Sequence, residues 1–558
     1  MPNDTADLTP TAEREARLRR LATEEFDVLV IGGGATGTGA ALDAASRGLS
    51  VALVERGDFA VGTSSRSTKL LHGGVRYLEQ AVKRLDRGQL HLVREALRER
   101  WLLLRNAPHL TRSLRLVTPL YGAWEAPYYV AGLKLYDLLA GRSNLEPSRW
   151  VNRTTALQHF PTLKAAALRG AVEYHDGQFD DARMNVALAI TAEEQGAVVV
   201  NYVEATALIK KRGAISGIVA VDRRPDPSGA PRAGAPAAGF EVRARVVVNA
   251  AGPFVDAVRE LDDAGLEPML EVSSGAHVVL PGRLCPPATG LLIPKTEDGR
   301  VLFLLPWLGH TLVGTTDHPA AVEASPRPTE DDISYILRHL RLYFDLPLER
   351  SDILAAWSGL RPLVRAGDHG HAGSDRAEAD LGAHGRRGND AGTAGISRDH
   401  TVVVSEAGLV TVTGGKWTTY RRMAKDAIDA AVRHGGLAPS RPSGTEHLVL
   451  AGGEDFEARG GELLVREFGL APDQAAHLNS AYGSRARQVA LLARAGFGER
   501  LVAGYPYIEA EALYAASREF ALTADDVLGR RIRLSFLNEA AAAQARGRVE
   551  ELLASAVS

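Results

Sequence analysis

The stretch FDVLVIGGGATGTGAALDAASRGLSVALVERGD, residues 26–58, decides the fold of this chain. Residues 26–31 are largely apolar and rich in β-branched side chains, which predicts a strand buried on both faces. Glycines follow without a gap: Gly32 permits a tight turn, Gly34 admits a pyrophosphate close to the backbone, and Gly37 allows close helix packing. The unpaired N–H groups of the next helix would face the phosphates of a dinucleotide.

A helix over residues 35–47 and a strand over residues 50–54 complete this pattern. The strand ends in Glu55, 23 residues after Gly32, where a carboxylate can accept hydrogen bonds from a ribose 2′-OH and disfavours NADP. A glycine-rich turn in an α/β fold without a ligand is the alternative, and the complete pattern argues against it. The residues assigned to the dinucleotide here are Gly32, Gly33, Gly34, Thr36, Gly37 and Glu55.

The composition is that of an ordinary globular chain. It has 558 residues, 45% of them hydrophobic and 24% charged, which predicts about three or four domain-sized units. A net charge of −3 provides no basic field, so we expect no nucleic-acid partner. Cys285 is the single cysteine, which excludes intramolecular disulfides and cysteine metal sites and fits a reducing compartment. We expect neither a signal peptide nor a membrane-spanning helix, which leaves peripheral membrane association open.

A polar run at residues 63–69 is followed by the sequence LLHGGVRY. Hydroxyls, a cation and a pair of glycines on one loop suit contacts with pyrophosphate, ribitol or a flavin ring. A solvated serine-rich loop is the alternative, which the dinucleotide turn just upstream disfavours. The residues assigned to the cofactor from this run are Thr63, Ser64, Ser65, Ser67, Lys69, His72, Gly73 and Gly74.

Two further glycine-rich turns follow apolar strands later in the chain. The strand predicted over residues 244–249 runs into Ala251 and Gly252, and the strand over residues 409–412 precedes TGGKWTTY. Close backbone approach at more than one place favours FAD over NAD, because an extended flavin nucleotide needs contacts at both ends. The third turn contributes Gly415, Lys416, Thr418 and Thr419 to the predicted cofactor contacts.

The remaining segments have weaker signals. We expect a charged, exposed helix before residue 25, a helix over residues 85–106 with a solvated charged face, and a turn over residues 176–181. The aromatic segment 124–139 is interpreted as core packing, with a partner or membrane surface as the alternative. An insert rich in glycine, alanine and histidine at about 367–395 is expected to be disordered, and its histidines are not interpreted as a metal site.

At this point the motifs support a family resemblance. IGGGATGTGAALDAASRGLSVALVE, TSSRSTKLLHGGVRYLE, SGLRPL, SRDH and GGKWTTYR, in this order, resemble the FAD-dependent respiratory glycerol-3-phosphate dehydrogenases. The resemblance implies an α/β fold: a Rossmann-type FAD-binding domain of the glycine/D-amino-acid oxidase-like superfamily, a mixed-sheet substrate domain and a C-terminal helical domain. The domains would be an N-terminal extension (1–25), the oxidoreductase with interleaved subdomains (26–438) and the helical domain (439–558). The chain departs from the family at Ser274, usually lysine, and at Trp417, usually leucine.

The resemblance also implies an activity within glycerol and glycerophospholipid metabolism. FAD would oxidise sn-glycerol 3-phosphate to dihydroxyacetone phosphate and pass the electrons to quinone. The protein would be cytoplasmic and peripherally attached to the inner face of the cell membrane, and a homodimer is an assembly that the resemblance allows. A soluble oxidase that uses dioxygen is one alternative. A noncatalytic flavin-binding scaffold or tRNA-modification protein is another, although such a protein needs no phosphate clamp.

The resemblance assigns roles to specific residues. Arg361 and Arg398 match phosphate-binding positions, and their guanidinium forks suit a dianion. His277 is the expected base for the C2 hydroxyl, with a purely structural histidine as the alternative. Lys416 could also stabilise negative charge on the reduced flavin. The positions that match contacts near the substrate and flavin are Arg76, Tyr77 and Lys416.

Overall fold

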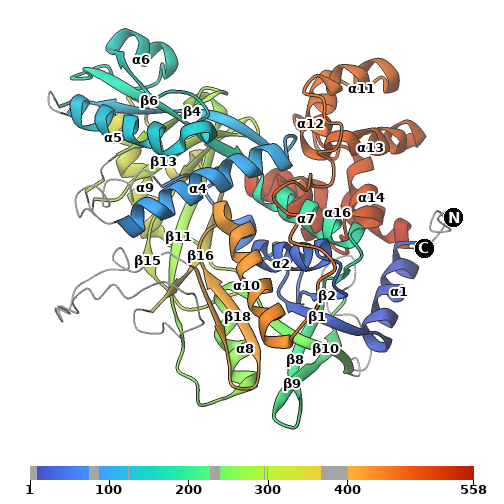
Figure 1. The fold of residues 1–558 in the computed structure, drawn as a ribbon. Helices are drawn as coiled ribbons and strands as arrows, with labels where there is room; N and C mark the ends of the chain where they lie inside the picture. Colours follow the sequence, from blue (N-terminus) through green and yellow to red (C-terminus); the bar gives the residue numbers. More distant parts are fainter. Residues whose placement is uncertain are drawn as a thin grey trace.

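Two mixed β-sheets and a helical C-terminal segment make up the molecule (Figure 1). The computed structural model describes residues 9–74, 87–122, 125–225, 239–294, 296–297, 299–365 and 400–557. The predicted disordered insert at 367–395 lies outside these residues, as do most of the first ten residues.

The first sheet carries the glycine turn of the opening motif. Its strand order is β17-β18-β10-β1-β2-β7, in which β18, β10, β1, β2 and β7 are parallel neighbours. The carboxyl ends of parallel strands meet at one edge of a sheet, so the turns after β1, β10 and β18 are brought together. The strands are β1 (Glu25–Ile31), β2 (Val51–Val54), β7 (Val198–Val200), β8 (Val203–Lys211), β9 (Ala214–Asp222), β10 (Phe240–Asn249), β17 (His400–Val404) and β18 (Leu409–Gly414).

Helices cover one face of this sheet, and a helix with a hairpin covers the other. The buried side chains of the three helices α2, α7 and α10 form one core cluster with the sheet. On the opposite face, α1 and the β8–β9 hairpin enclose a second cluster. The helices are α1 (Pro10–Thr23), α2 (Ala35–Ser46), α7 (Asp181–Glu194), α8 (Val255–Asp262) and α10 (Tyr420–Gly435).

The second sheet provides the opposite wall of the site. Its order is β15-β11-β14-β13-β12-β4-β6-β3, with β16 paired to β11 and β5 paired to β6. Helix α9 packs on one face, and α4, α5 and the C-terminal helices pack on the other. Its elements are β3 (Leu70–Leu71), α4 (Arg87–Asn106), β4 (Thr111–Leu120), α5 (Glu125–Ala140), β5 (Arg149–Asn152), α6 (Arg153–His159), β6 (Gly170–Phe179), β11 (Leu270–Pro281), β12 (Thr289–Ile293), β13 (Leu302–Trp307), β14 (His310–Gly314), β15 (His318–Pro319), α9 (Glu330–Tyr343) and β16 (Ala355–Val364).

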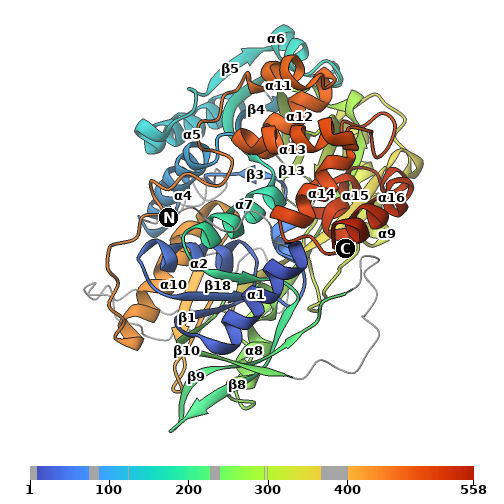
Figure 2. The ribbon, with the colours of Figure 1, turned by 90° about the vertical axis from the view of Figure 1, so that its right-hand side faces the viewer.

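The C-terminal segment is helical, as predicted, and it packs against helices that cover the first sheet and against the second sheet. Figure 2 shows α14 and α16 close to α1, and these helices are in contact. Its apolar side chains also join the core of the second sheet. The helices are α11 (Gly460–Phe468), α12 (Pro472–Tyr482), α13 (Ala486–Leu492), α14 (Glu509–Arg518), α15 (Leu534–Leu537) and α16 (Glu539–Val557), with a π-helical turn at Asp526–Arg531.

The helices α1 and α4 were predicted to have solvent-exposed charged faces, but the structure buries some of these charges. Arg14 of α1 is buried and donates to Asn201 and Asp222, so α1 is not a freely exposed helix. On α4, Glu99 and Arg100 are also buried, because each has an oppositely charged partner from another element. A charged side chain can be buried when it is paired, and sequence alone does not reveal the partner.

The predicted turn at 176–181 is wrong, because β6 continues to Phe179. Pairing with β4 on one side and β3 on the other overrides the turn-forming residues Asp176 and Gly177. On α5, Tyr136 is buried, which supports core packing for one face. Its other face is open: Tyr128 is 49% exposed and Leu138 is 75% exposed.

Candidate active site

A cavity of about 330 Å³ is lined by strands of the second sheet and by the glycine-rich turn that follows β18 of the first sheet. It brings together the polar run, the strands β11 and β16, the turn after β14 and the turn after β18. The predicted site residues that line it are Thr63, Ser67, His72, His277, Arg361, Gly415, Lys416 and Thr418.

A larger cavity of about 780 Å³ lies between the β13–β14 turn and helices α11 and α12. Two of its buried arginines already have carboxylate partners: Arg183 pairs with Glu519, and Arg531 pairs with Asp58. The smaller cavity contains His277 and Arg361 and adjoins the glycine turns. We therefore place the active site in the smaller cavity.

The glycines of the first turn are required by geometry. Gly32 has φ +109°, and a Cβ there would lie 2.6 Å from the carbonyl oxygen of Ala250. A Cβ on Gly37 would overlap the Gly32 carbonyl. Gly34 begins α2 without a side-chain cap, and the amide of Ala35 donates to Ser64 Oγ at 2.9 Å. The backbone here is shaped for the close approach of a ligand.

The two later turns adjoin the first. Ala251 and Gly252 follow β10, and an added Cβ at Gly32 would lie 3.0 Å from the Ala251 Cα. Gly415 has φ +64°, and the hydroxyl of Thr419 donates to the Lys416 carbonyl at 3.2 Å. The Thr413 hydroxyl at the end of β18 donates to the Gly252 carbonyl at 3.5 Å, so the third turn adjoins the second. The ligand contacts predicted at these turns stay predictions.

Glu55 is half-buried beside the first turn. Its carboxylate accepts hydrogen bonds from the amides of Gly33 at 2.6 Å and Gly57 at 2.8 Å. Burial raises the pKa of Glu55, and the two amides oppose this effect. Each carboxylate oxygen can accept a further donor. The predicted bond to a ribose hydroxyl thus remains compatible with the geometry.

Several side chains of the polar run hold the loop in its conformation, including Thr63 and Ser67, which also line the cavity. The hydroxyl of Thr63 donates to the Leu360 carbonyl at 2.7 Å, and the Ser67 hydroxyl donates to Asp181 at 2.7 Å. Lys69 is wholly buried and pairs with the same carboxylate at 2.7 Å. These hydrogen bonds and the ion pair hold the loop in its conformation.

His72 of this run is held by a buried network. Its Nδ1 lies 2.7 Å from Asp176, which also accepts from Arg100 at 2.6 Å and from the Tyr136 hydroxyl at 3.0 Å. The Tyr136 hydroxyl in turn accepts from the amide of Gly73 at 3.0 Å. Burial favours the neutral acid, but His72 and Arg100 outweigh it and hold the pKa of Asp176 below its ordinary value. Gly74, next to Gly73, has φ +88°.

His277 is buried at the inner end of the cavity. It comes from β11, is 3% exposed, and stacks on Trp357 of β16 with ring centroids 5.6 Å apart. Its Nε2 lies 2.9 Å from the hydroxyl of Thr68. Burial, followed by the charges of Lys69 and Arg361, lowers the pKa of His277 well below its ordinary value. The imidazole is therefore neutral near neutral pH and can accept a proton.

Arg361 presents a guanidinium that its neighbours hold in place. Nη1 donates to Asp317 at 3.0 Å, and Nη2 donates to the Thr315 hydroxyl and the Thr316 carbonyl, both at 3.0 Å. A Cβ on Gly275 would overlap Nη2, so the absence of a side chain there makes room for the fork. This geometry suits an anion in the cavity.

Two further cations, Arg66 and Arg300, line the cavity, and the sequence motifs did not identify them. With Arg361 and Lys416 they face a single carboxylate among the described lining residues, Asp317. Burial, with Arg530 and Arg533 nearby, lowers the pKa of Arg66 to about 10. The excess of positive charge favours a negatively charged substrate.

Some predicted residues contribute differently or cannot be placed. Ser274, where the family usually has lysine, does not line the cavity. Trp417 packs against Phe179 and Tyr420 and donates to the Ser64 carbonyl at 2.9 Å, consistent with a packing role. The predicted contacts Arg76, Tyr77 and Arg398 lie outside the described residues.

Glycine-rich turns beside a cavity with a buried histidine and several cations are typical of a dinucleotide-dependent oxidoreductase. Residues 27–421 match the family model of FAD dependent oxidoreductases, and residues 443–558 match the C-terminal domain of alpha-glycerophosphate oxidase. The chain belongs to the family of FAD-dependent glycerol-3-phosphate dehydrogenases, as its relatives show. The fold class and family predicted from the motifs are confirmed.

Three relatives illustrate the similarity. The mitochondrial glycerol-3-phosphate dehydrogenase of Homo sapiens is 48% identical over 551 residues, covering 97% of this chain and 72% of that protein. The mitochondrial enzyme of Arabidopsis thaliana is 45% identical over 564 residues, covering 98% of this chain and 85% of that protein. The structure of glycerol-3-phosphate dehydrogenase from Bacillus halodurans, complexed with FAD, superposes with a TM-score of 0.75 at 28% identity, covering 98% of this chain and 94% of that chain.

Proposed function

We propose that this chain oxidises sn-glycerol 3-phosphate to dihydroxyacetone phosphate. One observation carries the proposal: a neutral, buried His277 and the guanidinium of Arg361 line the same cavity beside the dinucleotide turns. A secondary alcohol that bears a phosphate needs both groups, a proton acceptor at the carbinol and a cation at the phosphate.

The residues of the turns fit FAD, which supplies the hydride acceptor when it is bound. Gly32 and Gly37 permit the tight turn and its close packing, and Gly34 leaves room for the pyrophosphate. The amides at the start of α2 would face the phosphates, apart from that of Ala35, which donates to Ser64. Gly415 and Lys416 line the cavity from the third turn.

His277 accepts the proton of the C2 hydroxyl as the C2 hydride leaves. Its low pKa keeps the imidazole unprotonated before the substrate arrives. Thr68 fixes the position of Nε2, and the stacked Trp357 fixes the plane of the ring. The orientation is therefore set before binding, which lowers the entropic cost of the reaction.

Arg361 binds the phosphate. Asp317 orients its guanidinium, and Thr315 and Thr316 hold the other nitrogen. Arg66, Arg300 and Lys416 add positive charge to the same cavity. Arg398, Arg76 and Tyr77 are our further proposed contacts from the family resemblance.

We also propose that quinone is the electron acceptor and that the protein attaches peripherally to the cytoplasmic, inner face of the cell membrane. The relatives are named dehydrogenases and not oxidases, which favours an acceptor other than dioxygen. The exposed side chains of Tyr128 and Leu138 on α5 support contact with a lipid surface. No helix in the described ranges is long and apolar enough to cross a membrane. A homodimer is part of the same proposal.

Use of dioxygen is the second candidate, because the C-terminal segment matches a model named for an oxidase. Steady-state turnover of sn-glycerol 3-phosphate with a quinone analogue, compared with turnover under dioxygen, separates the two. We expect fast reduction of the quinone analogue and little peroxide. Fast peroxide formation without reduction of the quinone analogue would favour the oxidase.

A further inference from the structure

Lys69 is a wholly buried lysine directly behind the active-site loop. Its ammonium lies 5.3 Å from the ring centroids of Trp307 and Trp357 and 5.9 Å from that of Phe536. Its backbone has φ +63°, a left-handed conformation that is costly for a side chain other than glycine. A strained backbone and a buried charge at one residue persist only where the surroundings fix both.

Two charged side chains from distant segments, Asp181 and Arg533, contact the same stretch of loop as Lys69. Its Nζ pairs with Asp181 at 2.7 Å and donates to the carbonyls of Ser65 at 2.8 Å and Ser67 at 3.0 Å. Arg533, from the C-terminal segment, donates to the same Ser65 carbonyl at 2.8 Å and to Asp181 at 3.2 Å. Both side chains are buried, so the three charges enclose one short stretch of loop.

Arg533 is itself fixed in one position. It has φ +64°, donates to the Gly529 carbonyl at 2.8 Å, and lies 4.4 Å from the ring centroid of Phe536. Asp181 also accepts from the amide of Ser67 at 3.0 Å. These side chains thus bind the carbonyls of Ser65 and Ser67 and the amide of Ser67.

The residue between Ser67 and Lys69 is Thr68, whose hydroxyl lies 2.9 Å from His277 Nε2. We propose that Lys69, Asp181 and Arg533 form a positioning unit that holds Thr68 against His277, so that the C-terminal helical domain determines the geometry of the proton acceptor. This inference rests on the proposed function only in naming His277 as that acceptor.

The charge of Lys69 has a second effect on His277. Lys69 and Arg361 both favour the neutral imidazole, in addition to its burial. Around Lys69, burial and Arg533 lower its pKa to about 8, while Asp181 and Asp180 oppose them. The other charged or titratable groups that share the cavity with His277 are Arg66, His72, Arg300, Asp317 and Lys416.

The test uses FAD-loaded variants with their flavin content measured. Arg533→Met should lower kcat roughly tenfold to a hundredfold, the effect of misplacing a reacting group by about 1 Å. The KM for sn-glycerol 3-phosphate should change little, and Arg533→Lys should restore part of kcat. Arg47→Met is the control, since Arg47 is also a buried arginine with carboxylate partners, Asp43 and Asp429, but it does not line the cavity.

A double variant tests the connection through Thr68. If Arg533 acts through Thr68, then Thr68→Val and Arg533→Lys together should lower kcat no more than the more damaging single change. Strictly multiplicative losses would overturn the proposal. So would an equal loss of kcat in Arg47→Met, because this result would show a general loss of stability.

The titration of His277 gives a readout without substrate. In holoenzyme with ¹³C-labelled histidine, the His277 signal is assigned from its absence in His277→Gln. Lys69→Met removes a positive charge, so the pKa of His277 should rise. An unchanged titration would overturn the electrostatic part of the proposal. Failure of the wild type to oxidise sn-glycerol 3-phosphate would instead contradict the proposed function and leave this titration interpretable.

Discussion

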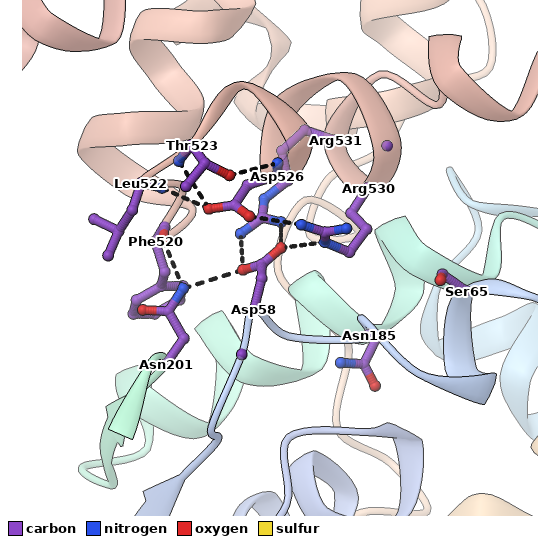
Figure 3. A network of polar contacts seen from close by, with 12 residues as sticks. Asp58, Ser65, Asn185, Asn201, Phe520, Leu522, Thr523, Asp526, Arg530 and Arg531 are labelled. Carbon is purple, nitrogen blue, oxygen red and sulfur yellow. Dashed lines mark hydrogen bonds and ion pairs between the residues drawn. The ribbon is translucent and has the colours of Figure 1, made fainter. Parts of the chain in front are cut away.

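Asp58 joins the dinucleotide turn to the C-terminal helices, and its replacement by asparagine should destabilise the protein (Figure 3). The wholly buried carboxylate accepts from Arg530 Nε at 2.5 Å, from Arg531 Nη2 at 2.9 Å and from Asn201 at 3.1 Å. Burial favours the neutral acid, but Arg531 and Arg530 outweigh it, so the pKa of Asp58 lies below its ordinary value. The charge therefore stabilises the fold above the unfolded pKa, and this contribution is lost as the pH falls.

Removing one partner of a buried ion pair typically costs about 3–5 kcal/mol. In Asp58→Asn the asparagine oxygen can still accept one bond, Arg530 retains Asp526 at 2.6 Å, and Arg531 retains the Glu519 carbonyl. We therefore expect a loss of about 3 kcal/mol, at the lower end of this range. Ala60, two residues on, donates to the Gly33 carbonyl at 3.2 Å, so the variant should also release FAD more readily.

Denaturant unfolding of the holoenzyme, followed by flavin fluorescence, measures both effects. Asp473→Asn is the control: Asp473 is bonded to Arg500 at 2.8 Å, but its side chain is 56% exposed. Such an exposed pair contributes less than about 1 kcal/mol. Equal losses of stability in the two variants would refute the reasoning, because burial would then make no difference.

Three further changes have definite expected outcomes. Gly34→Val places a side chain toward Ser64, whose hydroxyl accepts from the first amide of α2, and should abolish FAD retention measured by absorbance; an unaltered flavin spectrum would count against this turn. Gly275→Ala forces the Arg361 guanidinium aside, so KM for sn-glycerol 3-phosphate should rise roughly tenfold to a hundredfold, as expected for losing a charged hydrogen bond, whereas kcat changes less. Because the pKa of His277 is lowered, kcat/KM should persist as the pH falls below about 6.5, where an ordinary histidine protonates. A midpoint of the pH profile at or above this value would contradict the lowered pKa of His277.

Local patterns predicted the dinucleotide half of the fold well. The strand, turn and helix over residues 25–46 depend on neighbouring residues, so the glycines and the β-branched run were sufficient. The strand at residues 176–179 was missed because its conformation comes from pairing with β4, far away in the sequence. Burial of Glu99 and Arg100 was missed for the same reason, since each charge has a partner on another element.

The site was predictable in part. His277 and Arg361 were found through the family motifs, and the structure places both in one cavity. Thr68 is separated from His277 by 209 positions and Ser65 from Arg533 by 468, so no local pattern could connect them. Lys69 was predicted to contact the cofactor because it belongs to the polar run at residues 63–69, but the structure buries its charge behind the loop.

Anaerobic mixing of the purified holoenzyme with sn-glycerol 3-phosphate tests the central claim most directly. The account predicts that this substrate bleaches the flavin absorbance, that unphosphorylated glycerol at the same concentration does so far more slowly, and that Arg361→Ala removes most of the difference between them. The account would be contradicted if sn-glycerol 3-phosphate left the flavin oxidised, or if glycerol reduced it equally fast in the wild type.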